Sequence, residues 1–348
     1  MDADIESRIR KAGDASAQIA LGDEAEKHEN HQAARGWFAR AARAGRADAL
    51  RRLAANLLVH PPLAVPDGIA MARQAAELGD VEAIHLCAAL AANDSALKER
   101  WTIAFDYLLR AAEGGHDLAR EELRLLSGTD GENWRAMRNA IDVKQWLPVP
   151  QPHILSDSPA IRSFNRFLPP EFCDWIIARA QGRTRPATVY DPMHGGAGRM
   201  ENMRTNGHLG FSIADCDVVM MLIRARIAEA SGIAPHGHEW PMALHYRTGE
   251  EYRPHFDFFD VSSPALAADV ARAGQRIATF LIYLNEDFDG GETDFPRLNI
   301  RYRGKRGDAL LFRSVENGKP DARTLHAGLP PTRGEKWLYS QWIREPRT

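Results

Sequence analysis

The hydrophobic and polar positions of about the first 125 residues follow a repeating order. An aromatic or apolar start is followed by Ala-Ala, a glycine, and a second helix that opens with alanine, in residues 37–50, 71–84 and 107–120. The glycines Gly45, Gly79 and Gly115 are 34 and then 36 residues apart, the period of helix–turn–helix repeats. Each glycine is expected in the left-handed conformation where one helix ends. With a partial leading copy at 21–34, the pattern predicts three helix pairs and a cap.

The pattern changes beyond this region. Residues 146–159 form a proline-punctuated stretch, which predicts an extended linker. The spacing of apolar residues predicts amphipathic helices at 167–180 and 215–232. After Trp240, short β-rich runs alternate with turns. Many short strands at this spacing predict a sandwich or barrel with helices packed outside it. The predicted fold class is therefore α+β, with a helical repeat domain at 1–127, a linker at 128–159 and a β-rich domain at 160–348.

Composition and charge narrow the class of protein. The 348 residues are 44% hydrophobic and 26% charged, as in an ordinary globular protein, and the net charge is −3. This charge gives no general attraction to nucleic acid or to an anionic membrane, so neither partner is expected. The N-terminal stretch has no apolar core of a secretory signal, and the apolar run 277–284 is far shorter than the ~20 residues of a membrane span. A cytoplasmic protein is expected, with its three cysteines as reduced core thiols.

The first candidate metal-ligating residues lie in the stretch YRPHFDFFD, residues 252–260. His255 and Asp257 are two positions apart, so in a strand their side chains project from the same face. His326 follows downstream, and two imidazoles with one carboxylate form the facial triad of non-haem Fe(II) oxygenases. For the isolated His-x-Asp pair, the alternative is a hydrogen-bonded pair without a metal.

A wider set of motifs carries a family resemblance. It comprises FLPPEFCDWI (167–176), RTNG (204–207), HYRTGEEYRPHFD (245–257), TFLIYLNEDFDGGETDFP (279–296), GDALLF (307–312) and HAGLPPTRGEKW (326–337). With them, the chain from about residue 160 resembles the prolyl 4-hydroxylase-like, 2-oxoglutarate-dependent Fe(II) dioxygenases. The resemblance implies a double-stranded β-helix, or jelly roll. The repeats at 15–127 resemble the Sel-one-like branch of the tetratricopeptide-type repeats.

The same resemblance implies roles for single residues. His255, Asp257 and His326 take the positions of the iron ligands, and Lys336 that of the cation which pairs with the distal carboxylate of 2-oxoglutarate. Tyr283, Tyr252 and Thr279 are expected at the cosubstrate. Arg204 and Tyr246 are expected near the substrate, beside a loop at 190–207 that closes over it. Arg333 is the competing cation, expected instead at a surface turn.

The function implied is hydroxylation of a peptidyl, first of all prolyl, substrate with release of succinate and CO2. Fe(II), 2-oxoglutarate and O2 are the expected cofactors and cosubstrates, with ascorbate as a possible addition. The helical repeats offer a surface for a protein or peptide substrate, and the alternative is that they only pack on the second domain. Two alternatives stay open from the sequence: hydroxylation of a free amino acid or other small molecule, and a repeat-based adaptor with an inactive oxygenase domain.

Overall fold

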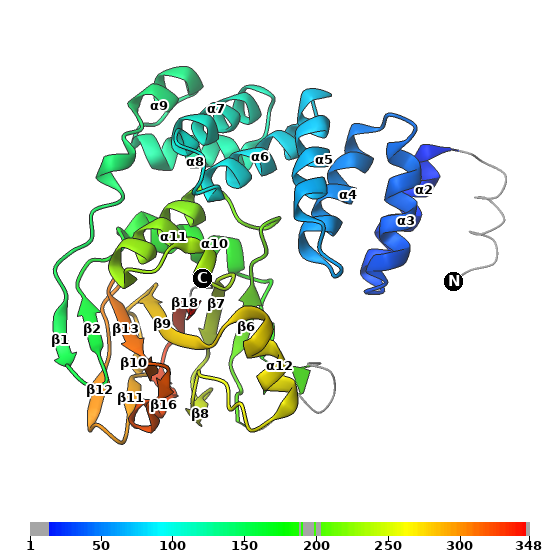
Figure 1. The fold of residues 1–348 in the computed structure, drawn as a ribbon. Coiled ribbons are helices and arrows are strands. Elements are labelled where there is room, and N and C mark those ends of the chain that lie inside the picture. The colour runs from blue at the N-terminus through cyan, green and yellow to red at the C-terminus, as the bar shows by residue number, and fades with distance from the viewer. Residues whose placement is uncertain (1–13, 188, 191–197, 200–202, 346–348) are drawn as a thin grey trace. The chain divides into compact units, whose positions relative to one another are not determined.

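The computed structural model describes residues 14–187, 189–190, 198–199 and 203–345 (Figure 1). They fall into two compact units, Met1–Val143 with Ser212–Met221 and Lys144–Phe211 with Leu222–Thr348. No helix in the described part of the chain is long and apolar enough to cross a membrane. Most of the predicted loop at 190–207, namely 191–197 and 200–202, lies outside the described residues.

The first unit is a series of paired helices. Its helices are α2 (Ala15–Lys27), α3 (His31–Ala42), α4 (Ala47–Val59), α5 (Val65–Glu77), α6 (Val81–Asn93), α7 (Arg100–Glu113), α8 (Asp117–Ser127) and α9 (Trp134–Ala140). Gly45, Gly79 and Gly115 lie in the turns within the pairs α3–α4, α5–α6 and α7–α8, at φ of 78°, 87° and 96°. The predicted left-handed glycines and the three helix pairs are therefore confirmed, and α2 is the leading helix.

Small side chains let these helices pack closely. Ala34, Ala41 and Ala49 are fully buried between neighbouring helices. A Cβ atom on Gly22 of α2 would collide with the ring of Phe38 on α3, so glycine is required where the two helices meet. The alanine-rich pattern of the sequence thus corresponds to a short distance between helix axes.

The predicted linker contains more structure than expected. Helix α9, the short 3-10 helix η1 (Val143–Gln145) and strand β1 (His153–Ser156) all lie within residues 128–159. β1 pairs antiparallel with β2 (Ile161–Phe164), and Trp146 stacks on Phe172 at 4.8 Å between ring centroids. The prolines limit helix here, yet they leave enough backbone donors and acceptors for an edge strand.

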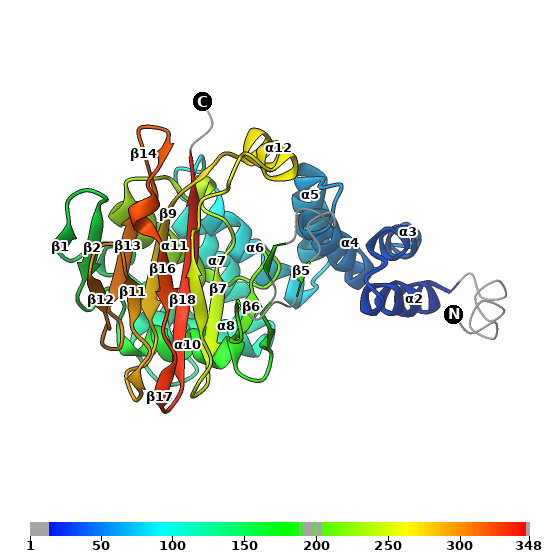
Figure 2. The same cartoon turned by 90° about the horizontal axis from the view of Figure 1, so that it is seen from below.

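The second unit is built on two antiparallel sheets (Figure 2). The eight-stranded sheet has the order β1-β2-β13-β9-β18-β7-β6-β3, and the four-stranded sheet the order β12-β11-β16-β8. The strands beyond β2 are β3 (Arg185–Pro186), β4 (Val189–Tyr190), β5 (Gly198–Arg199), β6 (Gly207–Gly210), β7 (Met242–Tyr246), β8 (Tyr252–His255), β9 (Arg276–Tyr283), β10 (Asp289–Gly290), β11 (Thr293–Phe295), β12 (Ile300–Tyr302), β13 (Ala309–Arg313), β14 (Val315–Glu316), β15 (Lys319–Pro320), β16 (His326–Gly328), β17 (Pro331–Arg333) and β18 (Lys336–Arg344). Together with the helical unit, this arrangement confirms the α+β class.

Helices accompany the sheets. They are α10 (Pro170–Ala180), α11 (Val218–Ser231), α12 (Pro264–Ala273), and the short 3-10 helices η3 (Pro235–Gly237) and η4 (Ala322–Thr324). α10 and α11 match the two predicted helices, whereas α12 was not predicted. Its alanine-rich run with proline in the first turn is a helix signal that the surrounding strands obscured.

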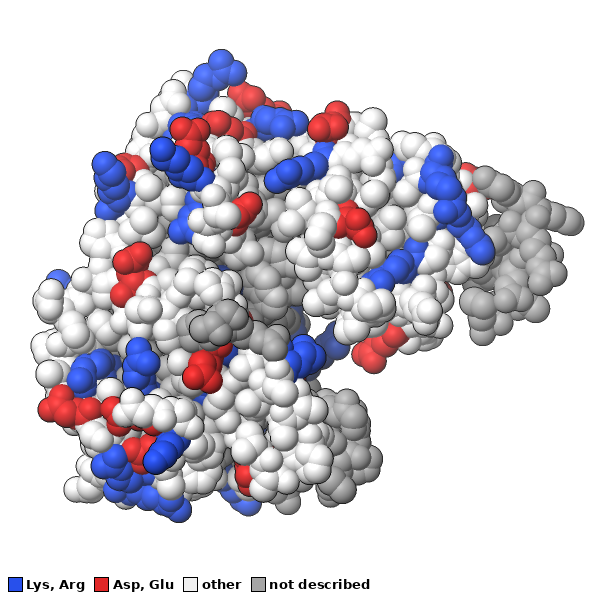
Figure 3. All heavy atoms as spheres, viewed as in Figure 1, with Lys and Arg blue, Asp and Glu red and all other residues white. Residues whose placement is uncertain are grey.

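The core of the second unit lies between the strands of the two sheets. Phe295 of the smaller sheet packs with Ile161, Leu281, Leu310 and Phe312 of the larger one. All three cysteines of the chain are buried and free, as predicted. On the face shown in Figure 3, Lys and Arg are interspersed with Asp and Glu, so neither sign of charge dominates that face.

Candidate active site

Strand register brings the two candidate histidines together. His255 is the last residue of β8 and His326 the first of β16, and the antiparallel pairing places them directly opposite each other. Asp257 follows β8 by two residues. One ligand atom from each of the three lies within 4.8 Å of the others. The Asp257 carboxylate is 3.7 Å from His255 Nε2 and 3.4 Å from His326 Nε2.

Backbone contacts fix the protonation of both rings. Nδ1 of His255 is 2.8 Å from the Arg253 carbonyl, and Nδ1 of His326 is 3.0 Å from the Thr324 carbonyl. Because a carbonyl oxygen only accepts hydrogen bonds, each Nδ1 carries the proton. In the neutral form of each ring, Nε2 then presents a lone pair to the space beside Asp257, as a metal ligand must.

The carboxylate is held in its ionised form. The Thr279 hydroxyl on β9 donates to Asp257 Oδ2 at 2.6 Å. Burial by itself raises the pKa of Asp257, but His326, His255 and the Thr279 hydroxyl together hold this pKa below its usual value. Burial, and next the neighbouring His326, lower the pKa of His255 to about 3, so this imidazole is neutral at physiological pH.

The donor set fits ferrous iron. Two neutral imidazoles and one carboxylate that share a buried spot are the facial ligand set of non-haem Fe(II). A structural zinc site would add a fourth ligand, usually a thiolate. The buried Cys87, Cys173 and Cys216 do not line this cavity.

Lys336 is buried in the same cavity. It is the first residue of β18, is fully buried, and lines the cavity that His255, Asp257 and His326 also line. Its Nζ donates to the Gly291 carbonyl at 2.9 Å and lies 4.2 Å from the centre of the Tyr246 ring. Burial lowers the pKa of Lys336 to about 7 against a smaller opposing effect of Glu292. Among the described residues no ion pair neutralises this ammonium, so the cavity is suited to an anionic ligand.

Arg333, the competing cation, lies elsewhere. Its side chain is 70% exposed, and Nε bonds Asp289 Oδ2 at 2.6 Å. Arg333 does not line the cavity.

Comparison with known proteins places this site in a family. Residues 241–344 match the model of the 2OG-Fe(II) oxygenase superfamily. The chain is 32% identical over 248 residues to prolyl 4-hydroxylase 1 of Arabidopsis thaliana, covering 64% of this chain and 84% of that protein. The chain belongs to the 2OG-Fe(II) oxygenase superfamily. A putative prolyl 4-hydroxylase of Acanthamoeba polyphaga mimivirus is 32% identical over 193 residues, covering 54% of this chain and 76% of that protein.

A solved structure is also similar. The viral collagen prolyl hydroxylase of Paramecium Bursaria Chlorella virus-1, in its 2OG complex, matches with a TM-score of 0.41 and 27% identity, over 53% of this chain and 96% of that chain. As a prolyl 4-hydroxylase-like member of its superfamily, the chain is a dioxygenase that uses Fe(II), 2-oxoglutarate and O2.

Tyr283 does not lie at the cosubstrate cavity, where the sequence analysis expects it. It shares strand β9 with Thr279 and Leu281, which line the cavity, but Tyr283 itself does not. Its hydroxyl donates to the Tyr302 carbonyl at 2.9 Å and is 2.9 Å from Thr293 Oγ1. Thr293, which the sequence reasoning missed, is the residue of this pair that reaches the cavity.

Thr279 also has a different partner from the one expected. It was predicted at the cosubstrate, but its hydroxyl is engaged by Asp257. The residue beside the Lys336 ammonium is Tyr246, which was predicted at the substrate. Period-two alternation correctly places Thr279 at the cavity, but it does not reveal which acceptor the hydroxyl finds.

Two predicted residues lie side by side on another wall of the oxygenase cavity. Tyr252 stacks on the His255 ring with centroids 3.4 Å apart, and the Arg204 guanidinium lies 4.7 Å from the centre of the Tyr252 ring. Arg204 is 7% exposed, and its Nε donates to Asn206 Oδ1 at 2.9 Å. Arg204 is therefore held against the cavity and does not extend into solvent.

Strand β18 contributes more to the cavity than was predicted. Lys336, Leu338, Ser340 and Trp342 all line it, as alternate residues of one strand do. Trp342 was predicted as barrel core, but it is only partly buried, and the Arg276 guanidinium lies 3.6 Å from its ring centre. Counting by twos from Lys336 would have identified Ser340 and Trp342.

Proposed function

We propose that His255, Asp257 and His326 hold Fe(II) and that Lys336 pairs with the distal carboxylate of 2-oxoglutarate. The observation that carries this assignment is the convergence of both Nε2 atoms on Asp257, in a cavity that also contains a fully buried ammonium. A buried cation is costly unless a counter-charge arrives, and a carboxylate of the cosubstrate supplies it. Tyr246 and Thr293, which line the same cavity, offer hydroxyl groups to this anion.

We further propose that the reaction is hydroxylation of a prolyl residue in a peptide, with release of succinate and CO2. The similar proteins named prolyl 4-hydroxylases support this substrate. The aromatic rings of Tyr252 and Trp342 on the cavity wall support it as well, because proline-rich segments pack on aromatic side chains. In this proposal Arg204, which lies against Tyr252, donates to a peptide carbonyl.

Each part of the chain has a separate task in this reaction. Fe(II) with 2-oxoglutarate and O2 supplies the oxidative decarboxylation that places one oxygen atom in a C–H bond of the substrate. The backbone carbonyls of Arg253 and Thr324 fix the imidazole tautomers, and Thr279 orients Asp257. The rings of Phe295 and Phe312 lie 5.7 and 4.6 Å from that of His326 and limit the access of water to this side of the site.

A substrate comparison tests the proposal. The full chain is incubated with Fe(II), 2-oxoglutarate and either a proline-rich peptide or free proline, and succinate and the product masses are measured. We expect succinate release together with a gain of one oxygen atom on a prolyl residue of the peptide, and no product with His255→Ala. Oxidation of free proline but not of the peptide would overturn the peptidyl assignment. Failure of the chain to release any succinate would overturn the enzymatic one.

We also infer that the helical repeats form a separate domain that binds the protein substrate. Stacked helix pairs such as α3–α4 and α5–α6 usually present a surface for another chain. A long protein substrate would then have a lower KM than a short peptide cut from it. Equal KM values for the two would refute this role of the repeats.

A further inference from the structure

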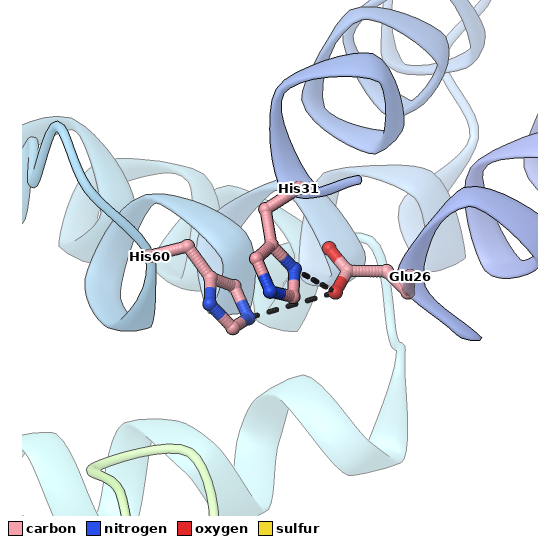
Figure 4. Close-up of side chains that lie close together, drawn as sticks. All are labelled: Glu26, His31 and His60. Carbon is pink, nitrogen blue, oxygen red and sulfur yellow. Dashed lines mark hydrogen bonds and ion pairs between the residues drawn. The ribbon is translucent and has the colours of Figure 1, made fainter. Parts of the chain in front are cut away.

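A second cluster of metal-ligand side chains lies in the helical unit. Glu26 near the end of α2, His31 at the start of α3 and His60 directly after α4 each offer a ligand atom within 4.8 Å of the other two. Figure 4 shows that both imidazoles point toward one oxygen of the carboxylate. His31 Nδ1 is 2.8 Å from Glu26 Oε2, and His60 Nε2 is 3.5 Å from the same atom.

The distances suit a small tetrahedral cation. Zinc binds nitrogen and oxygen at roughly 2.0–2.2 Å, so neighbouring donors of a tetrahedral site lie about 3.3 Å apart. The 3.5 Å separation of His60 from Glu26 is close to this value, and it is long for a hydrogen bond. The His31 contact must open from 2.8 Å when an ion replaces the shared proton. The rings stack with centroids 3.4 Å apart, and turning an imidazole about its soft second torsion lets the two lone pairs converge.

Further contacts hold the three residues in place. Asn56, 2% exposed, donates from Nδ2 to Glu26 Oε1 at 2.5 Å and to the His31 carbonyl at 3.0 Å. Arg35 donates to Asn56 Oδ1 at 2.7 Å and to the His60 carbonyl at 2.7 Å. Asn56 thus occupies one carboxylate oxygen and leaves Oε2 for the cation, as hydrogen bonds to the ligands do in metal sites.

A second pair of stacked imidazoles in the same unit shows a different arrangement. The rings of His85 and His116 are 4.3 Å apart, but His85 bonds Glu122 and His116 bonds Glu82. Glu122 also accepts the Val218 N–H at 2.8 Å, so its two oxygens serve separate donors. Convergence of three ligand atoms is therefore not a general consequence of histidine stacking in these helices.

We propose that Glu26, His31 and His60 form a zinc site that is separate from the catalytic iron site. The side chains are 28%, 30% and 27% exposed, so an ion can enter from solvent and water can fill the fourth position. Two nitrogens and one carboxylate suit Zn²⁺, whereas Mg²⁺ and Ca²⁺ take oxygen ligands. The ion would link the end of α2, the start of α3 and the segment that follows α4.

Zinc titration of a tag-free full-length chain tests the site. His326→Ala is present throughout, because the catalytic ligands would otherwise bind zinc as well. We expect one tightly bound Zn²⁺ per chain, measured by calorimetry and by metal analysis after gel filtration, that excess Mg²⁺ does not displace. Adding His60→Ala should weaken binding by roughly tenfold or more. The control His28→Ala removes an exposed histidine of the α2–α3 turn that bonds Glu24 at 3.1 Å, and it should leave binding unchanged.

Two results of the titration would overturn the proposal. One is the absence of stoichiometric zinc in the His326→Ala chain, and the other is an unchanged zinc affinity after His60→Ala. Circular dichroism checks the helices of each variant. If His60→Ala loses helical signal, His60→Gln is measured in its place and the same tenfold criterion applies, because glutamine keeps a polar side chain at the position.

Discussion

Replacing Lys336 with methionine separates folding from cosubstrate binding. The ammonium is fully buried and donates to the neutral Gly291 carbonyl, so in the absence of a ligand it is a buried charge without a counter-ion. Methionine has similar length and no charge. We therefore expect Lys336→Met to stabilise the unliganded protein while removing its response to 2-oxoglutarate.

The pKa of Lys336 gives the size of the expected gain in unfolding free energy. It falls from 10.5 to about 7, and each tenfold change in proton affinity corresponds to ~1.4 kcal/mol, so burying the charge costs about 5 kcal/mol. The variant leaves the Gly291 carbonyl without its donor, which costs roughly 1–3 kcal/mol. The expected net gain in unfolding free energy is about 2–4 kcal/mol at pH 7 or below.

The unfolding free energy of the natural protein should increase with pH. Between pH 7 and 10.5 the unfolded chain holds a proton on Lys336 that the folded chain has lost, so the unfolding free energy of the natural protein rises with pH in this window. The advantage of the variant should therefore shrink across the window and reverse before its upper end, where only the cost of the unpaired Gly291 carbonyl remains. If the anion pairs with the protonated amine as proposed, the affinity of the natural protein for 2-oxoglutarate should fall by about tenfold per pH unit above 7.

Thermal and chemical unfolding with and without 2-oxoglutarate measure both effects. Arg333→Met is the matched control, since it removes an exposed cation that is close to Lys336 in the chain but does not line the cavity. A Lys336→Met protein that is less stable than the natural one at pH 7 would refute the energetic reasoning. Loss of the 2-oxoglutarate response in Arg333→Met, with the response intact in Lys336→Met, would refute the assignment of the cation.

Further predictions concern other cavity residues. Thr279→Val should weaken Fe(II) binding by roughly 10–100-fold and Thr279→Ser should restore it, because the hydroxyl orients Asp257; metal titration measures both. Tyr246→Phe should raise the KM for 2-oxoglutarate, whereas Tyr283→Phe should lower stability by ~1 kcal/mol with little change in that KM, and the reverse pattern would contradict the geometry. Trp342→Ala should raise the KM for a proline-rich peptide more than that for 2-oxoglutarate in initial-rate assays, and equal changes would argue against contact with the peptide.

Local sequence patterns determined much of the architecture. The spacing of Gly45, Gly79 and Gly115 predicts the turns of three helix pairs, because a helix that reverses sharply needs a residue that tolerates positive φ. The two-residue spacing of His255 and Asp257 predicts a shared strand face, but β8 ends at His255 and Asp257 lies in the bend that follows it. The glycine turns depend on neighbours in the chain, so the sequence alone is sufficient to identify them.

The family motifs extended sequence-based prediction to residues that are far apart in the chain. They did not predict which groups those residues contact. His326 is 71 residues from His255, and only the antiparallel register of β8 and β16 places the two rings opposite each other. The neighbours that Thr279 and Tyr283 find in the fold decide what their hydroxyl groups bond. A hydroxyl bonds the nearest suitable acceptor in space, which the spacing along a strand does not specify.

The cluster of Glu26, His31 and His60 depends on tertiary structure in the same way. No spacing motif joins these residues, and they meet only because α2, α3 and α4 pack side by side. What the sequence by itself determined are the periodic helices, the strands and the types of ligand available. The packing of helices and the register of strands decided which of those ligands converge, because convergence requires positions in space that no single segment of the chain controls.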